Sequence, residues 1–322
     1  MTAARVEDQT TEHPIGPDGF VVIRLRSGDV RLQGTDGDRV IVHSRGGRSL
    51  RDLDIEAGDG SLSIGTDHHS ADLDLDVPAG VSIVVEAASA DLSARGLDGD
   101  QRYRTSSGDV ILSDVGGTIT VEAVSGDVEV TALGGSRLSL RTVSGDVSLA
   151  ATTVLALEIA TTSGEIEVAG RFDGDGPFRI ETVSGDTRLS PVNDVRVEME
   201  TISGDLDSRL DAHRDDSSGR RVLIVGQGGP TISIRSTSGD AHVDRERVIP
   251  PVSGRPPATY GRPTAPIPPD APLPELEVAS DVPEGADLEI LRALERGDID
   301  TAEAGRRLAD LDARSTGGDS DG

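Results

Sequence analysis

The chain has 322 residues, of which 58 are acidic and 31 basic, and its formal net charge is -27. Such an acidic chain is a poor candidate for non-specific binding to nucleic acid or to anionic membrane surfaces, because both need positive charge. It contains no cysteine, which excludes disulfides and thiolate metal sites. Every basic residue is arginine, so Schiff-base lysines and the lysine of a phosphate-binding loop are excluded too.

We predict residues 1–18 to be disordered. They lack the apolar run of a secretory signal, and no stretch of the chain approaches the length of a membrane-spanning helix. We therefore expect a cytoplasmic protein that does not insert into membranes. Strand-like apolar segments follow at irregular spacing, and we interpret residues 19–69 as a capping region. The terminal repeats of a repeat protein are usually atypical, because they must cover an open sheet end.

A repeat organised around the tripeptide Ser-Gly-Asp occupies residues 70–245. Between the copies that begin at Ser107 and Ser203 the steps are 18, 19, 19, 21 and 19 residues, and the copy at Ser163 has Glu in place of Asp. Further copies begin at Ser27 and Ser238, and the related Ser-Ala-Asp begins at residues 70 and 89. A fixed period of this length indicates a repeat architecture.

Each unit reads as two short strands that meet at the tripeptide. In one unit, residues 110–113 and 118–123 are strand-like, and Gly116-Gly117 turns the chain between them. A glycine can adopt positive φ without steric cost, while Ser and Asp hydrogen-bond nearby backbone groups. We therefore predict structural corners at the central glycines of the motif, which are Gly108, Gly126, Gly145, Gly164, Gly185 and Gly204.

Two architectures fit this pattern, a parallel β-solenoid with one coil per unit and an antiparallel meander of hairpins. We favour the solenoid, because stacking each corner on the previous one, about 4.8 Å away, explains why one turn is repeated and the other is free. The prediction is an all-β fold, a parallel β-solenoid or β-helix of about 18–21-residue coils over residues 19–245. Its core should be thin and aliphatic, since the chain has three Phe, two Tyr and no Trp.

The motif also resembles a known family. Repeats of the form Thr-x-Ser-Gly-Asp-Val-x-Val, preceded by Asp-Val-Pro-Ala-Gly-Val-Ser-Ile at residues 76–83, are similar to the bacterial putative-adhesin family of β-strand-repeat proteins. That family is a domain of unknown function. The resemblance covers roughly residues 19–245 and implies a β-solenoid-like fold.

The C-terminal part of the chain has a different composition. Prolines predict an extended linker at residues 246–283, because paired prolines cannot join a sheet interior. Residues 284–313 are similar to the short SHOCT-type helical hairpin, and residues 314–322 are predicted to be a disordered tail. The apolar stripes of the two expected helices are formed by Leu288, Leu291, Leu294, Leu308 and Leu311. A hairpin of this size cannot bury its apolar faces alone. We therefore expect it to self-associate or to dock to a protein partner. The alternative is that it packs on its own solenoid.

Acidic residues recur along the predicted stack and are the candidate ligands of a cation. Stacked carboxylates repel one another, and Ca²⁺, which prefers oxygen ligands, could relieve that repulsion. The weak calcium candidates are Asp72, Asp74, Asp76, Asp91, Asp109, Asp127 and Asp146. We favour a structural role in which each Asp accepts backbone N–H bonds at its own corner. No cofactor is predicted.

No catalytic constellation stands out, because the acidic residues are uniform along the repeat and no local cluster of Asp, Arg and His breaks the pattern. This weighs against a carbohydrate-active enzyme, although other β-helices cleave polysaccharides. We predict a non-enzymatic interaction or scaffold protein with an acidic solenoid surface and a C-terminal hairpin for oligomerisation or docking. The alternative is a calcium-dependent or glycan-binding surface adhesin, which would need export.

Overall fold

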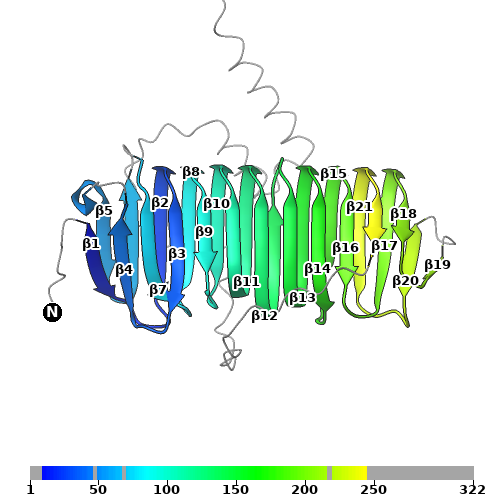
Figure 1. Ribbon diagram of the computed structural model, residues 1–322, viewed down its shortest axis with the longest axis horizontal. Helices are drawn as coiled ribbons and strands as arrows, with labels where there is room; N and C mark the ends of the chain where they lie inside the picture. Colours follow the sequence, from blue (N-terminus) through cyan, green and yellow to red (C-terminus); the bar gives the residue numbers. More distant parts are fainter. Residues whose placement is uncertain (1–8, 46–48, 67–69, 216–219, 245–322) are drawn as a thin grey trace, which may run out of the picture.

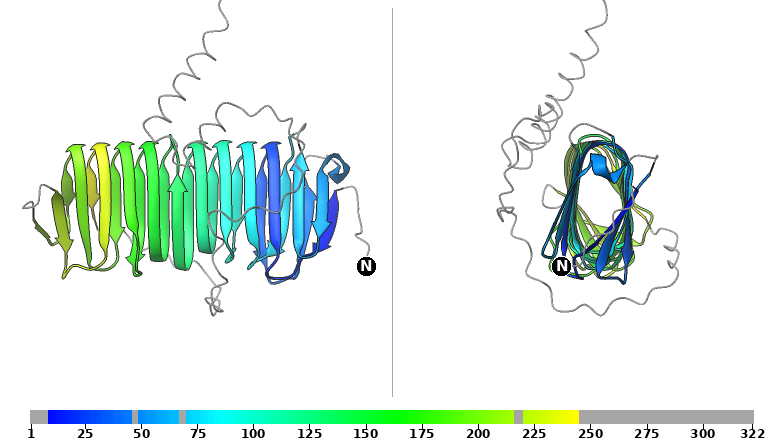
Figure 2. Two further views of the ribbon diagram at one scale, coloured as in Figure 1. Left: turned by 180° about the vertical axis from the view of Figure 1, so that it is seen from behind. Right: turned by 90° about the vertical axis from the view of Figure 1, so that its left-hand side faces the viewer.

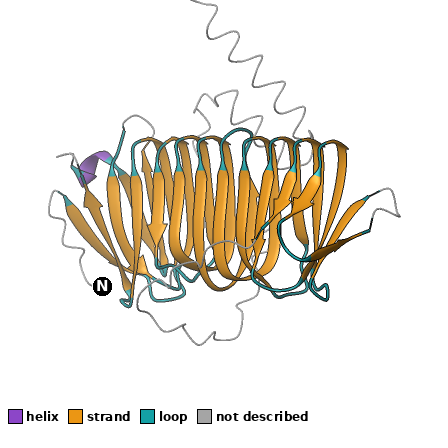
Figure 3. Cartoon of the chain, turned by 45° about the vertical axis from the view of Figure 1, so that its right-hand side comes forward, coloured by secondary structure: helices purple, strands orange, loops and turns teal. Residues whose placement is uncertain are grey.

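The computed structural model describes residues 9–45, 49–66, 70–215 and 220–244. The predicted linker, helical hairpin and tail, with the five leucines of the hairpin, lie outside the described residues. Within these ranges the chain is built from strands and loops, and the helical element there is a single 3₁₀ turn, η1 (Leu50–Asp52) (Figure 3). No helix in this part of the protein is therefore long and apolar enough to cross a membrane.

The strands are short at both ends of the protein and longest in its middle. The N-terminal part holds β1 (Thr10–Pro14), β2 (Phe20–Ser27), β3 (Val30–Thr35), β4 (Arg39–Ser44), β5 (Asp54–Gly58), β6 (Ser61–Thr66), β7 (Leu73–Pro78), β8 (Ser82–Ser89) and β9 (Leu92–Arg95). The middle holds β10 (Gln101–Ser107), β11 (Val110–Ser125), β12 (Val128–Arg141), β13 (Val147–Ser163), β14 (Ile166–Phe172), β15 (Phe178–Ser184) and β16 (Thr187–Pro191). The C-terminal part holds β17 (Val195–Ser203), β18 (Leu206–Ser208), β19 (Ala212–Arg214), β20 (Arg221–Val225), β21 (Thr231–Ser238) and β22 (Ala241–Val243).

Neighbouring coils pair in parallel, which confirms the solenoid and excludes the meander. Tyr103 of β10 pairs with Val121 of β11, and the motif serines Ser107 and Ser125 pair in the same register. The coils stack into a straight row in Figure 1, and the end-on view in Figure 2 shows a flattened tube with two long sides. One side carries the strands that precede the Ser-Gly-Asp corner, which we call face A. The other carries the strands that follow it, which we call face B.

The core lies between the two faces and is thin and mostly aliphatic. In one coil Val110 and Leu112 point inward from face B, and Ile119 and Val121 point inward from face A, each with no exposed surface. Successive coils repeat this arrangement and join into one continuous apolar core. Because side chains alternate across a strand, the residues between these positions form the outer surfaces of the two faces.

The spatial order of the coils differs from their chain order at both ends. The coil of β2 and β3 lies between the coil of β6 and β7 and the coil of β8 and β9. At the other end β21 lies between β15 and β17, and β22 between β16 and β18. Figure 1 shows the yellow strand β21 between these greener neighbours. Residues 20–35 are thus an internal coil, and the prediction that all of residues 19–69 form a cap was wrong for them.

Charge on face A favours the observed position of the coil formed by β21 and β22. Arg235 of β21 pairs with Glu181 of β15 on one side and Glu200 of β17 on the other, with N–O distances of 3.8 and 3.6 Å. If the coils of β15 and β17 were neighbours in the same register, Glu181 would lie directly opposite Glu200. Like charges in that position destabilise a sheet, and the inserted coil replaces them with two opposite-charge pairs.

Antiparallel strands close both ends of the stack. At the N-terminal end β4 pairs with β7, β1 pairs with β4, and β5 pairs with β6. At the C-terminal end β20 pairs with β17, and the three-residue β19 pairs with β20. Short and charged edge strands protect a sheet from pairing with other chains.

Strand β1 falls within the residues predicted to be disordered, so that prediction was wrong at residues 10–14. The inward side chains of β1 are Thr11 and His13, which are both buried, and Thr11 Oγ1 lies 3.1 Å from His13 Nε2. These polar residues hide the apolar alternation by which a half-buried strand is recognised.

Candidate functional site

The Thr-x-Ser-Gly-Asp motif forms a self-supporting corner. The hydroxyl of Thr105 donates a hydrogen bond of 2.8 Å to the carbonyl of Ser107, and Thr161 makes the same bond to Ser163 at 3.0 Å. Thr105 and Thr161 are buried, so this bond satisfies a polar group inside the coil. The threonine therefore holds the turn from within.

The glycine allows both the turn and the close stacking of coils. The glycines predicted as corners have φ between +110° and +144°. A side chain at Gly126 would overlap the carbonyl oxygen of Gly108 in the preceding coil. Glycine is thus required by conformation and by the approach of the neighbouring backbone.

The motif aspartates join neighbouring coils. The backbone N–H of Asp127 donates to Asp109 Oδ1 at 2.9 Å, and the N–H of Asp146 donates to Asp127 Oδ1 at 2.8 Å. We call this series the aspartate ladder, and its acceptors are Asp72, Asp91, Asp109, Asp127, Asp146, Asp186 and Asp240. We expected each carboxylate to bond its own corner. Instead it bonds the next coil, because stacking brings that N–H closer to the carboxylate oxygen.

The structure does not gather the calcium candidates into one site. Each ladder aspartate turns one oxygen into the stack, and Asp74 Oδ1 lies 2.9 Å from Arg45 Nε. Among the described residues, no group of three or more His, Asp or Glu side chains lies close enough together to hold a metal ion. The candidate carboxylates therefore lie singly along the stack, whereas a protein calcium site gathers several oxygen ligands around one ion.

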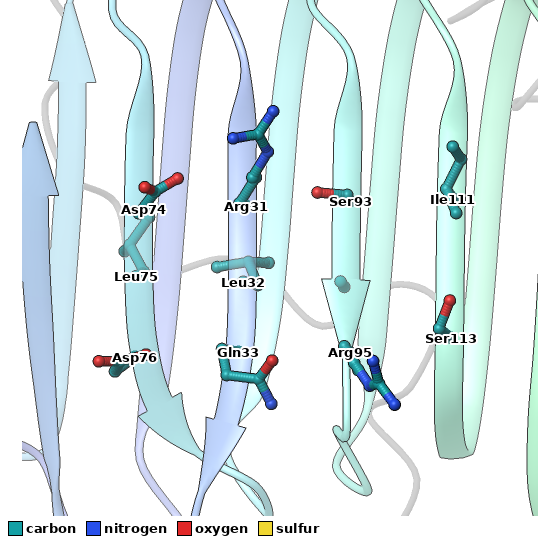
Figure 4. A pocket seen from close by; sticks show the side chains of 11 residues that line it. Arg31, Leu32, Gln33, Asp74, Leu75, Asp76, Ser93, Arg95, Ile111 and Ser113 are labelled. Atoms are coloured by element: carbon teal, nitrogen blue, oxygen red, sulfur yellow. The ribbon is translucent and has the colours of Figure 1, made fainter. Parts of the chain in front are cut away.

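The structure adds a concave site, a groove on face B. It has a volume of about 380 Å³ and is crossed by β7, β3, β9 and β11 (Figure 4). Arg31, Leu32, Gln33, Asp74, Leu75, Asp76, Ser93, Ala94, Arg95, Ile111 and Ser113 line it. These residues meet because the coil of β2 and β3 lies between the coils of β6 and β7 and of β8 and β9. Arg31 therefore pairs with Asp74 on one side and with Ser93 on the other.

The outward side chains of the groove form two rows across the coils. The upper row in Figure 4 runs through Asp74, Arg31, Ser93 and Ile111, and the lower row through Asp76, Gln33, Arg95 and Ser113. Sequence analysis singled out Asp74 and Asp76 and missed the other polar residues. They come from separated stretches of chain, and the repeat alone does not show which coils are neighbours.

Ion pairs fix several charges around the groove. Arg95 Nη2 lies 3.0 Å from Asp114 Oδ2, and Arg45 holds Asp74 as described above. Arg31 is exposed, and it makes no ion pair within the described part of the chain. The exposed fraction of Ile111 is 45%, which is high for a large apolar side chain on a strand.

The groups with shifted pKa values lie elsewhere. Burial raises the pKa of Tyr103 and lowers the pKa of His13. A hydrogen bond with Glu167 and the charge of Glu165 raise the pKa of Arg188, which lies 2.7 Å from Glu165 Oε1. None of these three residues lines the groove. Their shifts follow from core packing and from a surface ion pair.

A comparison with known families now identifies the repeat. Residues 81–244 match the model of the Toastrack family, DUF4097. The chain belongs to the Toastrack family. The resemblance based on the Ser-Gly-Asp repeats is thereby confirmed for an adhesin-like domain of unknown function. The likeness of residues 284–313 to a SHOCT-type hairpin stays a prediction.

Solved structures match the chain at low similarity. A putative adhesin from Bacteroides fragilis is 14% identical with a TM-score of 0.38, and the match covers 74% of this chain and 96% of that one. A putative lipid binding protein from Parabacteroides distasonis is 12% identical with a TM-score of 0.28, and coverage is 74% and 96%. A putative adhesin from Parabacteroides merdae is 12% identical with a TM-score of 0.21, and coverage is 74% and 95%. Similarities this low carry no argument about function, and no curated protein matches the chain.

Proposed function

We propose that this Toastrack protein is a non-enzymatic interaction protein, a rigid scaffold that presents its solenoid surface to protein partners. The aspartate ladder carries the proposal, because its side chains bond one coil to the next. The motif thus maintains a long regular surface. Stacked repeats of this kind provide extended binding surfaces in other proteins.

The corner edge of the solenoid gives this surface its charge. Asp109, Asp127 and Asp146 are exposed at the edge, although one oxygen of each is bonded within the stack. An edge with carboxylates about 4.8 Å apart favours a basic protein partner and disfavours nucleic acid. We propose that partners meet the solenoid along this acidic edge in the cytoplasm.

The C-terminal hairpin, residues 284–313, is proposed to supply oligomerisation or docking. The described chain ends at Asp244, directly after β22, and β22 lies between β16 and β18. The last described residue therefore follows an internal strand of the stack and not one of its closing strands. A linker of the length of residues 246–283 would let the hairpin reach a second copy or a partner while the solenoid stays rigid.

Light scattering tests this role. We expect the molar mass of the full chain to be a multiple of the monomer mass, and removal of residues 281–322 to reduce the number of chains in the assembly. A full-length variant with Leu288→Asp and Leu308→Asp keeps the charge-rich tail and loses the apolar stripes, so it should behave like the truncation. Circular dichroism would show that the solenoid is intact. If neither variant changes the number of chains in the assembly, oligomerisation through residues 284–313 is contradicted.

The second candidate is a ligand-binding surface protein, calcium-dependent or glycan-binding. The groove on face B favours it, because it places polar side chains from several coils around a hollow. Its calcium-dependent form predicts that Ca²⁺ raises the melting temperature or changes the mass of the full chain. If Ca²⁺ does so while truncation does nothing, the ligand-binding candidate replaces the scaffold.

A further inference from the structure

We propose that the groove on face B binds a neutral, hydroxyl-rich ligand, a sugar unit of an oligosaccharide. The site deepens the second candidate function, and it uses the solenoid alone. Its success or failure is therefore separate from the role proposed for residues 284–313. The shape of the groove, its charge balance and its apolar wall favour this ligand.

The hollow arises from a difference in side-chain length. Ser93 lies between Arg31 and Ile111 in one row, and Ser113 ends the other row beside Arg95. Short side chains next to long ones leave a depression over the serines (Figure 4). The volume of about 380 Å³ lies at the lower end of the range for small-molecule sites, about 300–1,000 Å³.

The charges of the groove balance. Arg31 and Arg95 supply two positive charges, and Asp74 and Asp76 supply two negative charges. An anion would approach the carboxylates and a cation would approach the guanidinium groups, so neither sign is favoured as a whole. Charge balance therefore favours a neutral ligand.

The hydrogen-bonding groups select the kind of neutral ligand. Guanidinium groups only donate and ionised carboxylates only accept, whereas the serine hydroxyls do both. A ligand hydroxyl can also donate and accept, so the hydroxyls of one ligand can pair with both kinds of group in the groove. Ion pairs to Asp114 and Arg45 hold Arg95 and Asp74 in place, which reduces the ordering cost of binding.

Ile111 gives the groove an apolar wall. Its counterparts in the adjacent coils are Ser93 and Glu129, so an exposed isoleucine breaks a polar row. A sugar ring has an apolar C–H face besides its hydroxyls. Packing that face against Ile111 would remove apolar surface of both partners from water.

The experiment titrates the full chain with cellotriose, maltotriose, chitotriose and mannotriose by calorimetry and NMR. We expect at least one to bind with a Kd of millimolar or below, and Ser93→Arg, which fills the hollow, to weaken binding about tenfold or more. The matched control is Ser148→Arg, an exposed serine in the same row outside the groove, which should leave affinity unchanged. Melting curves would show that both variants fold.

Two results would overturn the proposal. One is the absence of binding by all four trisaccharides at about 10 mM. The other is an equal loss of affinity in Ser93→Arg and Ser148→Arg, which would place binding elsewhere. A chain that lacks residues 281–322 should bind like the full chain. If binding fails while the truncation still reduces the number of chains in the assembly, the scaffold role stands and the saccharide site does not.

Discussion

An aspartate of the ladder combines a favourable bond with an unfavourable charge. Asp127 accepts the N–H of Asp146, while its own N–H donates to Asp109. A charge-assisted bond to a backbone N–H is stronger than a neutral one. The carboxylates nevertheless repel along the edge, since every coil contributes the same sign. We therefore expect the acceptor oxygen of the side chain to contribute more to stability than its negative charge.

This distinction predicts different outcomes for two substitutions at Asp127. Asp127→Asn keeps an acceptor oxygen and removes a charge, so we expect unchanged or slightly higher stability. Asp127→Ala removes the acceptor and should lower the free energy of unfolding by about 1 kcal/mol. Denaturant titration would measure both. If Asn costs as much as Ala, the negative charge of the acceptor is needed at the edge.

His13 predicts a pH dependence at the N-terminal end. Burial lowers the pKa of His13, so the folded chain resists a proton that the unfolded chain binds below its ordinary pKa of 6.5. Stability should therefore fall as the pH drops below about 6.5 and should be independent of this group above it. Hydrogen exchange of β1 between pH 7.5 and 5 would detect the loosening. His13→Gln should remove the pH-dependent part, and a variant with the same pH profile as the natural chain would refute this assignment.

At the scale of elements, the sequence specifies the strands and corner of each coil well. It does not specify which coils lie next to one another. The Ser-Gly-Asp period predicts where strands meet, because glycine and an acidic residue recur at most of the corners. It does not predict which coils touch, since any two coils can make the same ladder. The order at the C-terminal end is visible only in the charges of Arg235, Glu181 and Glu200. The groove could not be predicted either. Arg31 lies next to Ser93 only because the coil of β2 and β3 stacks beside the coil of β8 and β9.

The inserted coil offers a test of that charge pattern. Arg235→Glu would place three glutamates in a row across β15, β21 and β17, and we expect a loss of about 1–2 kcal/mol, since the side chains are partly exposed. Hydrogen exchange should show the loss in β21 and β22 first. Adding Glu181→Arg should recover part of it, and Arg235→Gln should have an intermediate effect. Equal effects of Glu and Gln would mean that charge does not hold this coil.

At the scale of the whole molecule, the formal charge of -27 acts against the compact fold, and the ladder concentrates part of it on one edge. Screening should therefore stabilise the protein. Raising NaCl from about 20 to about 500 mM shortens the Debye length from roughly 20 Å to a few Å, and we expect the melting temperature to rise by a few degrees. At matched ionic strength, CaCl₂ should add nothing if the carboxylates act singly. A larger rise in CaCl₂ would show that neighbouring aspartates share the ion, and the ladder would then be a binding site as well as a structural one.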